Sequence, residues 1–220
     1  MDLYPVWLSF QVATSATALT LLAGLPLAWL LARRRFPGHD LLAGAVVLPL
    51  VLPPTVLGFY LLVLLGPHGP VGAALEAVGL APLVFTFPGL VLGSVIYSLP
   101  FVVQPLQNAF EAIPERALET AATLRASARD TFFSVVLPLA KPGFLTASVL
   151  GFAHTVGEFG VVLMIGGNIP GETRTISIAI YDRVQAFDEG AAASMSALLI
   201  GLSLFAIAVV YLLAGRGRPR

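Results

Sequence analysis

Cysteine is missing from this sequence of 220 residues, and charged side chains are scarce. Without cysteine the chain can form no disulfide and offers no thiolate ligand to a metal ion. Charged residues make up 11% of the chain, less than half the share in an average soluble domain, whereas 57% of the residues are hydrophobic. A soluble fold of this size could not keep that much apolar surface away from water. The composition therefore predicts an integral membrane protein.

An excess of one charge and a cleavable leader are also lacking. Twelve Lys and Arg balance twelve Asp and Glu, so no net charge directs the chain toward nucleic acid. The first apolar stretch, about residues 8–32, is too long for a signal peptide, and no small-residue cleavage pattern follows it. We expect this stretch to remain as the first spanning helix.

Five stretches are apolar enough to cross a bilayer as helices, which takes about 20 such residues each. They cover about residues 8–32, 41–66, 87–110, 143–167 and 191–214. A sixth, shorter membrane-associated piece, around 80–86 or 175–184, is the alternative to a total of five. The sequence thus predicts one all-α transmembrane domain over residues 1–220.

The basic residues indicate how this domain is oriented. With five spans, ten of the twelve Lys and Arg fall on one side of the membrane: Arg33, Arg34, Arg35, Arg116, Arg125, Arg129, Lys141, Arg216, Arg218 and Arg220. Only Arg174 and Arg183 fall on the other side. Because basic residues favour the cytoplasmic side, we expect the N-terminus outside and the C-terminus in the cytoplasm.

Prolines interrupt the second apolar stretch, where PLVLPPTVLG covers residues 49–58. Each proline removes a backbone donor, and in lipid the freed carbonyl needs a neighbouring group or water. Ordinary kinked packing explains such a cluster, and so does a helix that lines a transport path. Thr55 is the path candidate here, and Ser98 beside Pro100 is another in the third stretch.

The polar segment 114–134, between the third and fourth stretches, reads as a short amphipathic helix followed by a turn and a second helix. Ala117, Ala121 and Leu124 repeat at helical spacing and form its apolar stripe. Such a helix could lie on lipid headgroups. Its small, alanine-rich face, with Leu124 as the main anchor, instead favours docking into the cleft of a cytoplasmic protein.

Several residues of this segment resemble the "EAA" signature of membrane subunits of ABC importers, in which a coupling helix sits in a groove of the ATPase. The corresponding positions are Glu119, Thr120, Ala121, Ala122, Leu124 and Arg125, with Leu137 and Pro138 behind the segment. Arg125 stands where the signature has the glycine that makes the turn after the helix. Arginine adopts such a turn only at some energetic cost.

Three further runs are similar to the permease subunits of molybdate importers. They are GEFG at 157–160, NIPGETRT at 168–175 and LPLVLPPTVLGFYLLVLLG at 48–66. Sulfate and thiosulfate permeases share the general pattern but usually lack the NIPGETRT run. The resemblance extends over about residues 5–214.

Membership of this family implies an importer of molybdate or tungstate in the inner membrane of a bacterium or archaeon. It implies a homodimer of this chain, two cytoplasmic ATP-binding subunits and an extracytoplasmic molybdate-binding protein. No G-x-x-x-x-G-K-[ST] loop occurs, so we expect no cofactor and no metal in this chain, with ATP and Mg held by the ATPase. A sulfate or thiosulfate permease is the alternative, and a proton-coupled secondary transporter using Glu158 is a more remote one.

The resemblance also suggests where an oxyanion would pass. Candidate donors are Thr55, Ser98 and Thr155, with Ser94, Thr146 and Ser148 as further hydroxyls; each could instead bond its own helix backbone. Glu158 is a poor anion ligand because its carboxylate repels an anion. We expect it to accept hydrogen bonds in a gate where Gly157 and Gly160 loosen the helix.

Arg174 is one of only two basic residues expected on the outer side. It could pair within its loop with Glu172, Asp182 or Asp188. Alternatively, Arg174 contacts the binding protein or attracts the anion.

Overall fold

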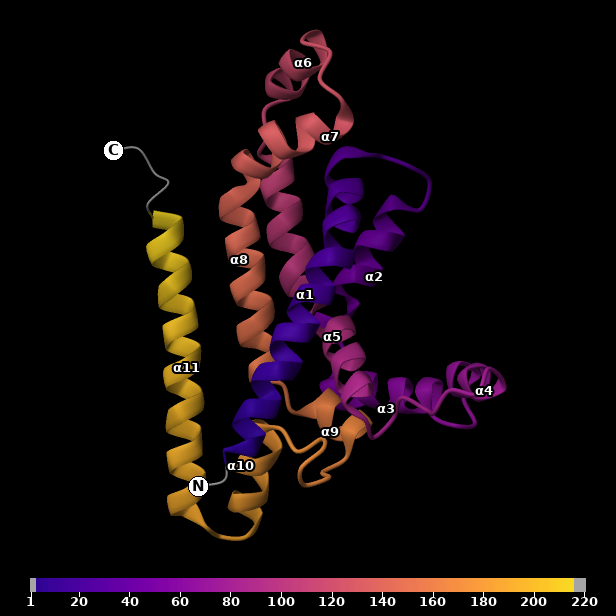
Figure 1. The fold of residues 1–220 in the computed structure, drawn as a ribbon, viewed down its shortest axis with the longest axis vertical. Helices are drawn as coiled ribbons and strands as arrows, with labels where there is room; N and C mark the ends of the chain where they lie inside the picture. The colour runs from indigo at the N-terminus through magenta and orange to yellow at the C-terminus, as the bar shows by residue number, and fades with distance from the viewer. Residues whose placement is uncertain (1–2, 216–220) are drawn as a thin grey trace.

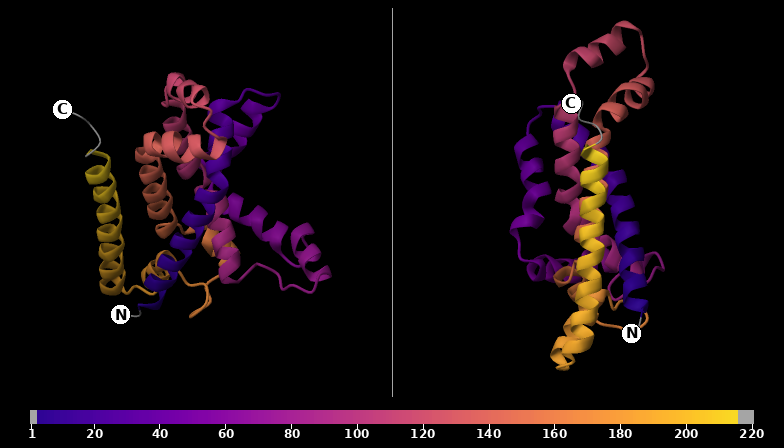
Figure 2. Two further views of the ribbon diagram at one scale, coloured as in Figure 1. Left: turned by 45° about the horizontal axis from the view of Figure 1, so that its top comes forward. Right: turned by 90° about the vertical axis from the view of Figure 1, so that its left-hand side faces the viewer.

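The computed structural model describes residues 3–215, and within that range all regular structure is helical (Figure 1). Four long helices run lengthwise: α1 (Tyr4–Arg33), α5 (Phe87–Glu111), α8 (Leu137–Val156) and α11 (Glu189–Gly215). α1 packs along α5 and α8, and α11 stands beside α8 (Figure 2). Five segments of the described chain are long and apolar enough to span a membrane, as the sequence predicts.

The second apolar stretch does not form the single span expected over residues 41–66. It divides into α2 (His39–Val51), which packs on α5, and α3 (Pro54–Leu65), which leaves the bundle sideways and is followed by α4 (Pro70–Ala77) (Figure 1). Leu52 and Pro53 between them are extended, with ψ near 137° and 136°. Proline disfavours the helical conformation of the residue before it, so two successive prolines end α2 and redirect the chain.

The fourth span begins earlier and ends sooner than the expected 143–167. Helix α7 (Ala128–Thr131) continues through a π-helical segment (Phe132–Val136) into α8, so the prolines at 138 and 142 do not start the helix but lie within it. In the π segment the Leu137 N–H bonds the Phe132 carbonyl, a wider turn beside prolines that cannot donate. Residues 157–159 then separate α8 from the short α9 (Gly160–Gly166).

The core forms where α1, α5 and α8 approach closely. Val102, Val103, Leu106 and Phe110 of α5 are completely buried. A Cβ placed at Gly151 of α8 would lie only 2.7 Å from the Val102 side chain, so a larger residue would push α8 away from α5. Small residues at such contacts are typical of membrane helices, which gain little from burying apolar surface out of lipid.

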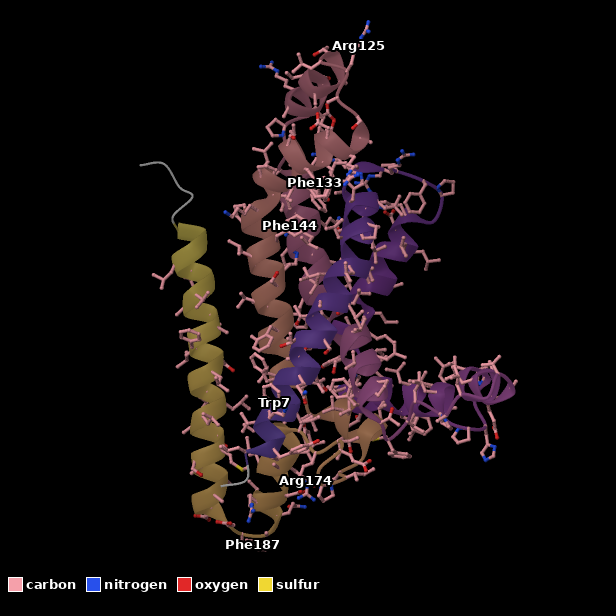
Figure 3. All side chains as sticks on the ribbon, in the orientation of Figure 1. Trp7, Arg125, Phe133, Phe144, Arg174 and Phe187 are labelled. Atoms are coloured by element: carbon pink, nitrogen blue, oxygen red, sulfur yellow. The ribbon has the colours of Figure 1, made fainter. Side chains whose placement is uncertain are left out.

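The two ends of the bundle carry different features. The hairpin of α6 (Glu115–Thr123) and α7 lies at one end, where α1 and α11 also finish (Figure 1). The opposite end is formed by α9, by α10 (Ile176–Gln185) and by the first residues of α1. Figure 3 shows Arg125 at the hairpin end and Arg174 at the opposite end. This arrangement agrees with the predicted charge asymmetry, although Arg216, Arg218 and Arg220 lie outside the described residues.

Candidate transport path and coupling segment

Glu158 lies in the short connection between α8 and α9 and is buried, with 7% of its surface exposed. Its Oε1 accepts a hydrogen bond from the backbone N–H of Val161 at 2.8 Å. The first N–H groups of a helix have no partner within the helix, and a carboxylate there also complements the helix dipole. Glu158 therefore caps α9 and holds the α8–α9 connection in place.

The glycines on either side of Glu158 have different surroundings. A Cβ at Gly160 would lie 2.6 Å from the Cβ of Pro54, whereas one at Gly157 would meet nothing nearer than 3.7 Å. On the facing helix, a Cβ at Gly58 would lie 2.7 Å from the Met164 Cβ. The proline-rich run and the GEFG run, which are far apart in the sequence, thus meet where α3 packs on α9, and Thr55 is exposed beside this contact.

Ser98 and Thr155 come together inside the bundle. Ser98 Oγ lies 2.8 Å from Thr155 Oγ1 and 2.9 Å from His154 Nδ1, and Thr155 Oγ1 donates to the Gly151 carbonyl at 2.8 Å. The two hydroxyl residues are only 1% and 5% exposed. Both hydroxyls face the α5–α8 interface, so they are not placed to contact an anion directly.

The remaining hydroxyl candidates are either bonded to their own helix or buried away from any path. Thr146 and Ser148 donate to backbone carbonyls four residues earlier in α8, the back-bonding that membrane helices often show. Ser94 is fully buried in α5, with no hydrogen-bond partner in the described chain.

His154 was not among the residues predicted for the path, because the three histidines are scattered in the sequence. In the structure its ring stacks on Phe101 with 3.8 Å between the ring centroids and lies 5.0 Å from the ring of Tyr97. The side chain is half-buried. Tyr97 and Phe101 are four residues apart in α5, and this helical spacing of aromatic residues can be seen in the sequence.

Helix α6 ends in a turn with arginine at its centre. Arg125 has φ of 57°, in the left-handed region that usually takes glycine. The N–H of Ala126 bonds the Ala121 carbonyl, and the N–H of Arg125 bonds the Ala122 carbonyl, both at 3.0 Å. These two bonds define a Schellman C-cap, so arginine makes the turn that glycine makes in the signature.

The coupling candidates differ in accessibility. Leu124 is 78% exposed at the tip of the hairpin, whereas Ala121 is buried against it. The exposed members of the set also include Glu119, Thr120, Ala122, Arg125 and Pro138, and Leu137 is half-buried. Leu124 is therefore accessible for contact with another protein.

Arg33 contacts the joint between α5 and α6, a role that the sequence did not suggest. Its Nη2 donates to the carbonyls of Phe110 at 2.5 Å and Ile113 at 2.9 Å. The guanidinium also lies 5.6 Å from the ring of Trp29. A cation that binds the last carbonyls of a helix satisfies groups with no partner in the helix, so Arg33 fixes the end of α5 to α1.

Arg174 pairs within the loop region at the other end. Its Nε donates to Asn168 Oδ1 at 2.6 Å and lies 3.4 Å from Asp182 Oδ2, and Asn168 donates to both Asp182 oxygens. Arg183 pairs with Asp188 at 3.2 Å. About a third of the Arg174 side chain is exposed (32%), so the pairing within the loop leaves part of this side chain accessible.

Residues 24–218 match the family described as binding-protein-dependent transport system inner membrane component. The molybdenum transport system permease protein ModB of Azotobacter vinelandii is 58% identical over 212 residues, which cover 96% of this chain and 92% of that protein. ModB of Escherichia coli K12 is 38% identical over 216 residues, or 98% and 94% of the two chains.

More distant relatives include a sulfate transport system permease protein, CysT of Synechocystis, which is 34% identical over 210 residues, covering 96% of this chain and 73% of that protein. A crystal structure of a bacterial ABC transporter involved in the import of alginate has a TM-score of 0.72 at 16% identity, covering 100% of this chain and 82% of that one. A crystal structure of a bacterial alginate ABC transporter with a bound periplasmic protein has a TM-score of 0.71 at 18% identity, covering 96% and 79%. At these identities the likeness shows the fold.

Proposed function

Because this chain belongs to the family of binding-protein-dependent inner membrane transport components, we propose that it forms the membrane pathway for molybdate in an ABC importer. The observation that carries this proposal is 58% identity to a molybdenum transport permease over nearly the full length of both chains. The sulfate transport permease of Synechocystis is more distant, at 34% identity. The chain is a multi-pass inner membrane permease, not an enzyme. Tungstate, which has the same shape and charge, is the second substrate that this proposal includes.

The proposed assembly contains two copies of this chain, two cytoplasmic ATPase subunits that hold ATP and Mg, and an extracytoplasmic molybdate-binding protein. The projecting α6–α7 hairpin, with Leu124 exposed at its tip, supports docking to the ATPase (Figure 1). The hairpin end of the bundle is then cytoplasmic, and the end that carries Arg174 faces the binding protein. A carrier driven by protons would have no use for such a hairpin.

Alternating access would open the path toward each side in turn. The gate in this proposal is the contact of α3 with α9, where Gly160 approaches Pro54 and Glu158 caps α9. Thr55 supplies an exposed hydroxyl beside it. Binding of ATP would move the hairpin, and α8, which continues from α7 through the π segment, would carry that movement to the gate.

Reconstitution in proteoliposomes tests this function. The chain, its ATPase and its binding protein are combined, and uptake of molybdate is measured with excess tungstate or sulfate as competitor. We expect uptake that requires ATP, competition by tungstate and none by sulfate. Equal competition by sulfate would favour a sulfate permease, and uptake that an uncoupler abolishes without any ATPase would favour a proton-driven carrier.

A further inference from the structure

One face of α5 carries polar and aromatic side chains through the length of the bundle. Tyr97, Phe101, Gln104 and Asn108 follow each other at spacings of four, three and four, which places them on one side of a helix. None of the four is buried, and the amides of Gln104 and Asn108 have no hydrogen-bond partner in the described chain. Amides without partners are unfavourable in hydrocarbon, so this face meets water.

His154 of α8 adds a titratable group to the same face. Its ring lies against Phe101 and Tyr97, and its Nδ1 reaches Ser98, the twelfth of the 25 residues of α5. The imidazole is therefore held near the middle of this helix. Ionisable groups at such a depth typically face a water-filled path and act on the transported ion.

The hydrogen bonds of Ser98 and Thr155 determine which nitrogen of the ring carries a proton. Thr155 uses its only proton to bond the Gly151 carbonyl, so Ser98 must donate its own proton across the 2.8 Å contact to Thr155 Oγ1. Ser98 Oγ then accepts from His154, which therefore carries its proton on Nδ1. The other nitrogen, Nε2, has no partner in the described chain and is not buried.

We propose that Nε2 of His154 contacts the oxyanion as it passes, an inference that rests on the proposed function. In the neutral tautomer Nε2 carries a lone pair, so it must first take a proton from the water of the path; the doubly protonated ring then donates from both nitrogens, and the approaching oxyanion stabilises its positive charge. Phe101, stacked on the ring, stabilises the same charge through its π face. The buried Ser98 and Thr155 orient the ring from behind.

Two amide substitutions separate contact with the anion from a merely structural role. The amide of Asn stands where Nδ1 stands and can still donate to Ser98, whereas the amide of Gln reaches the position of Nε2. If Nε2 contacts the anion, His154→Asn lowers molybdate uptake about tenfold and His154→Gln stays within about threefold of the wild type, as expected for one charge-assisted hydrogen bond. A ring that only packs against Ser98 would give the opposite order.

A third variant, His154→Arg, places a permanent cation in the path without relying on Nδ1. Uptake above that of His154→Asn supports the proposal, and uptake no better than His154→Asn counts against it. Each variant is first checked for assembly with the ATPase by size-exclusion chromatography, and only assembled complexes are compared. Wild-type complexes that take up no molybdate would refute the proposed function, whereas equal uptake by the wild type and His154→Asn would refute the role of His154 alone.

Discussion

Arg125 makes a left-handed turn that most L-residues avoid. A residue with a Cβ is less stable in this conformation by about 1–2 kcal/mol, and glycine avoids most of that cost. The Schellman bonds from Ala126 and Arg125 keep the turn nevertheless. The guanidinium then projects at the tip of the hairpin, next to the exposed Leu124 (Figure 3).

Arg125→Gly is expected to stabilise the hairpin by about 1 kcal/mol, because glycine adopts the same φ without a steric cost. Amide hydrogen exchange at residues 124–128 would slow by about fivefold. Arg125→Ala is the matched control, since it removes the charge and keeps the unfavourable conformation. If the ATPase binds the charge of Arg125, both variants weaken assembly equally. Amide hydrogen exchange that is as slow in the alanine variant as in the glycine variant would contradict the conformational argument.

Arg33 offers a second prediction about a single side chain. Replacement by alanine removes the donor to the Ile113 carbonyl and one of the two donors to the Phe110 carbonyl, which also accepts from the Ile113 N–H. We expect the free energy of unfolding in detergent to fall by about 1.5–3 kcal/mol, as for a hydrogen bond to a charged group. The neighbouring Arg34 is exposed, with no partner in the described chain, so Arg34→Ala is the control. Equal losses from both variants would mean that the α5 carbonyls do not depend on Arg33.

Glycines at the contact of α3 with α9 allow these two helices to lie close together. Because Gly160 and Gly58 each face a neighbouring atom at less than 3 Å from any added Cβ, one methyl group must move a helix. We expect Gly160→Ala to cost about 1–3 kcal/mol of stability through overpacking and to reduce uptake more than it reduces assembly. Gly44→Ala in α2 is the control, because nothing lies within 4 Å of its added Cβ. A Gly160→Ala variant with normal uptake would remove the α3–α9 contact from the gate.

The long apolar elements could be predicted from sequence, and their interruptions only in part. Hydropathy identifies α1, α5 and α11 within a few residues, because a spanning helix must bury an unbroken apolar length. It does not reveal that Pro53 ends a helix whereas Pro138 and Pro142 lie within one. That difference depends on neighbouring turns: a π segment precedes Pro138, and an extended pair replaces the helix at Leu52 and Pro53.

The prediction of the site from sequence is also incomplete, because the sequence does not show which way individual side chains point. Sequence reasoning selected Ser98 and Thr155 as hydroxyls in a transport path but could not tell that both point into the α5–α8 interface. His154, one position before Thr155, also reaches Ser98, but its ring lies on Phe101 and is only half-buried. Which of two adjacent residues is more exposed depends on how α8 is rotated against α5. That rotation cannot be predicted from the sequence of either helix alone.

Over the whole molecule, the hairpin of α6 and the loop of Arg174 lie at opposite ends (Figure 3). The lack of cysteine makes this testable, since single cysteines at the exposed positions 123 and 172 would be the only thiols in the chain. In right-side-out vesicles we expect a membrane-impermeant maleimide to label Glu172→Cys and not Thr123→Cys, with the reverse in inside-out vesicles. Labelling of both from one side would contradict the proposed orientation.

The close contact of α3 with α9 also has a consequence for evolution. The atoms in the way are the Cβ atoms of Met164 and Pro54, which every residue except glycine has. A larger residue at Gly58 is therefore tolerable only beside a glycine at 164, and one at Gly160 only beside a glycine at 54. Among relatives with the same fold, positions 58 and 164 should therefore covary, as should 54 and 160. Descendants of this sequence could change these helices in pairs of substitutions, while a single change at either glycine would be removed by selection.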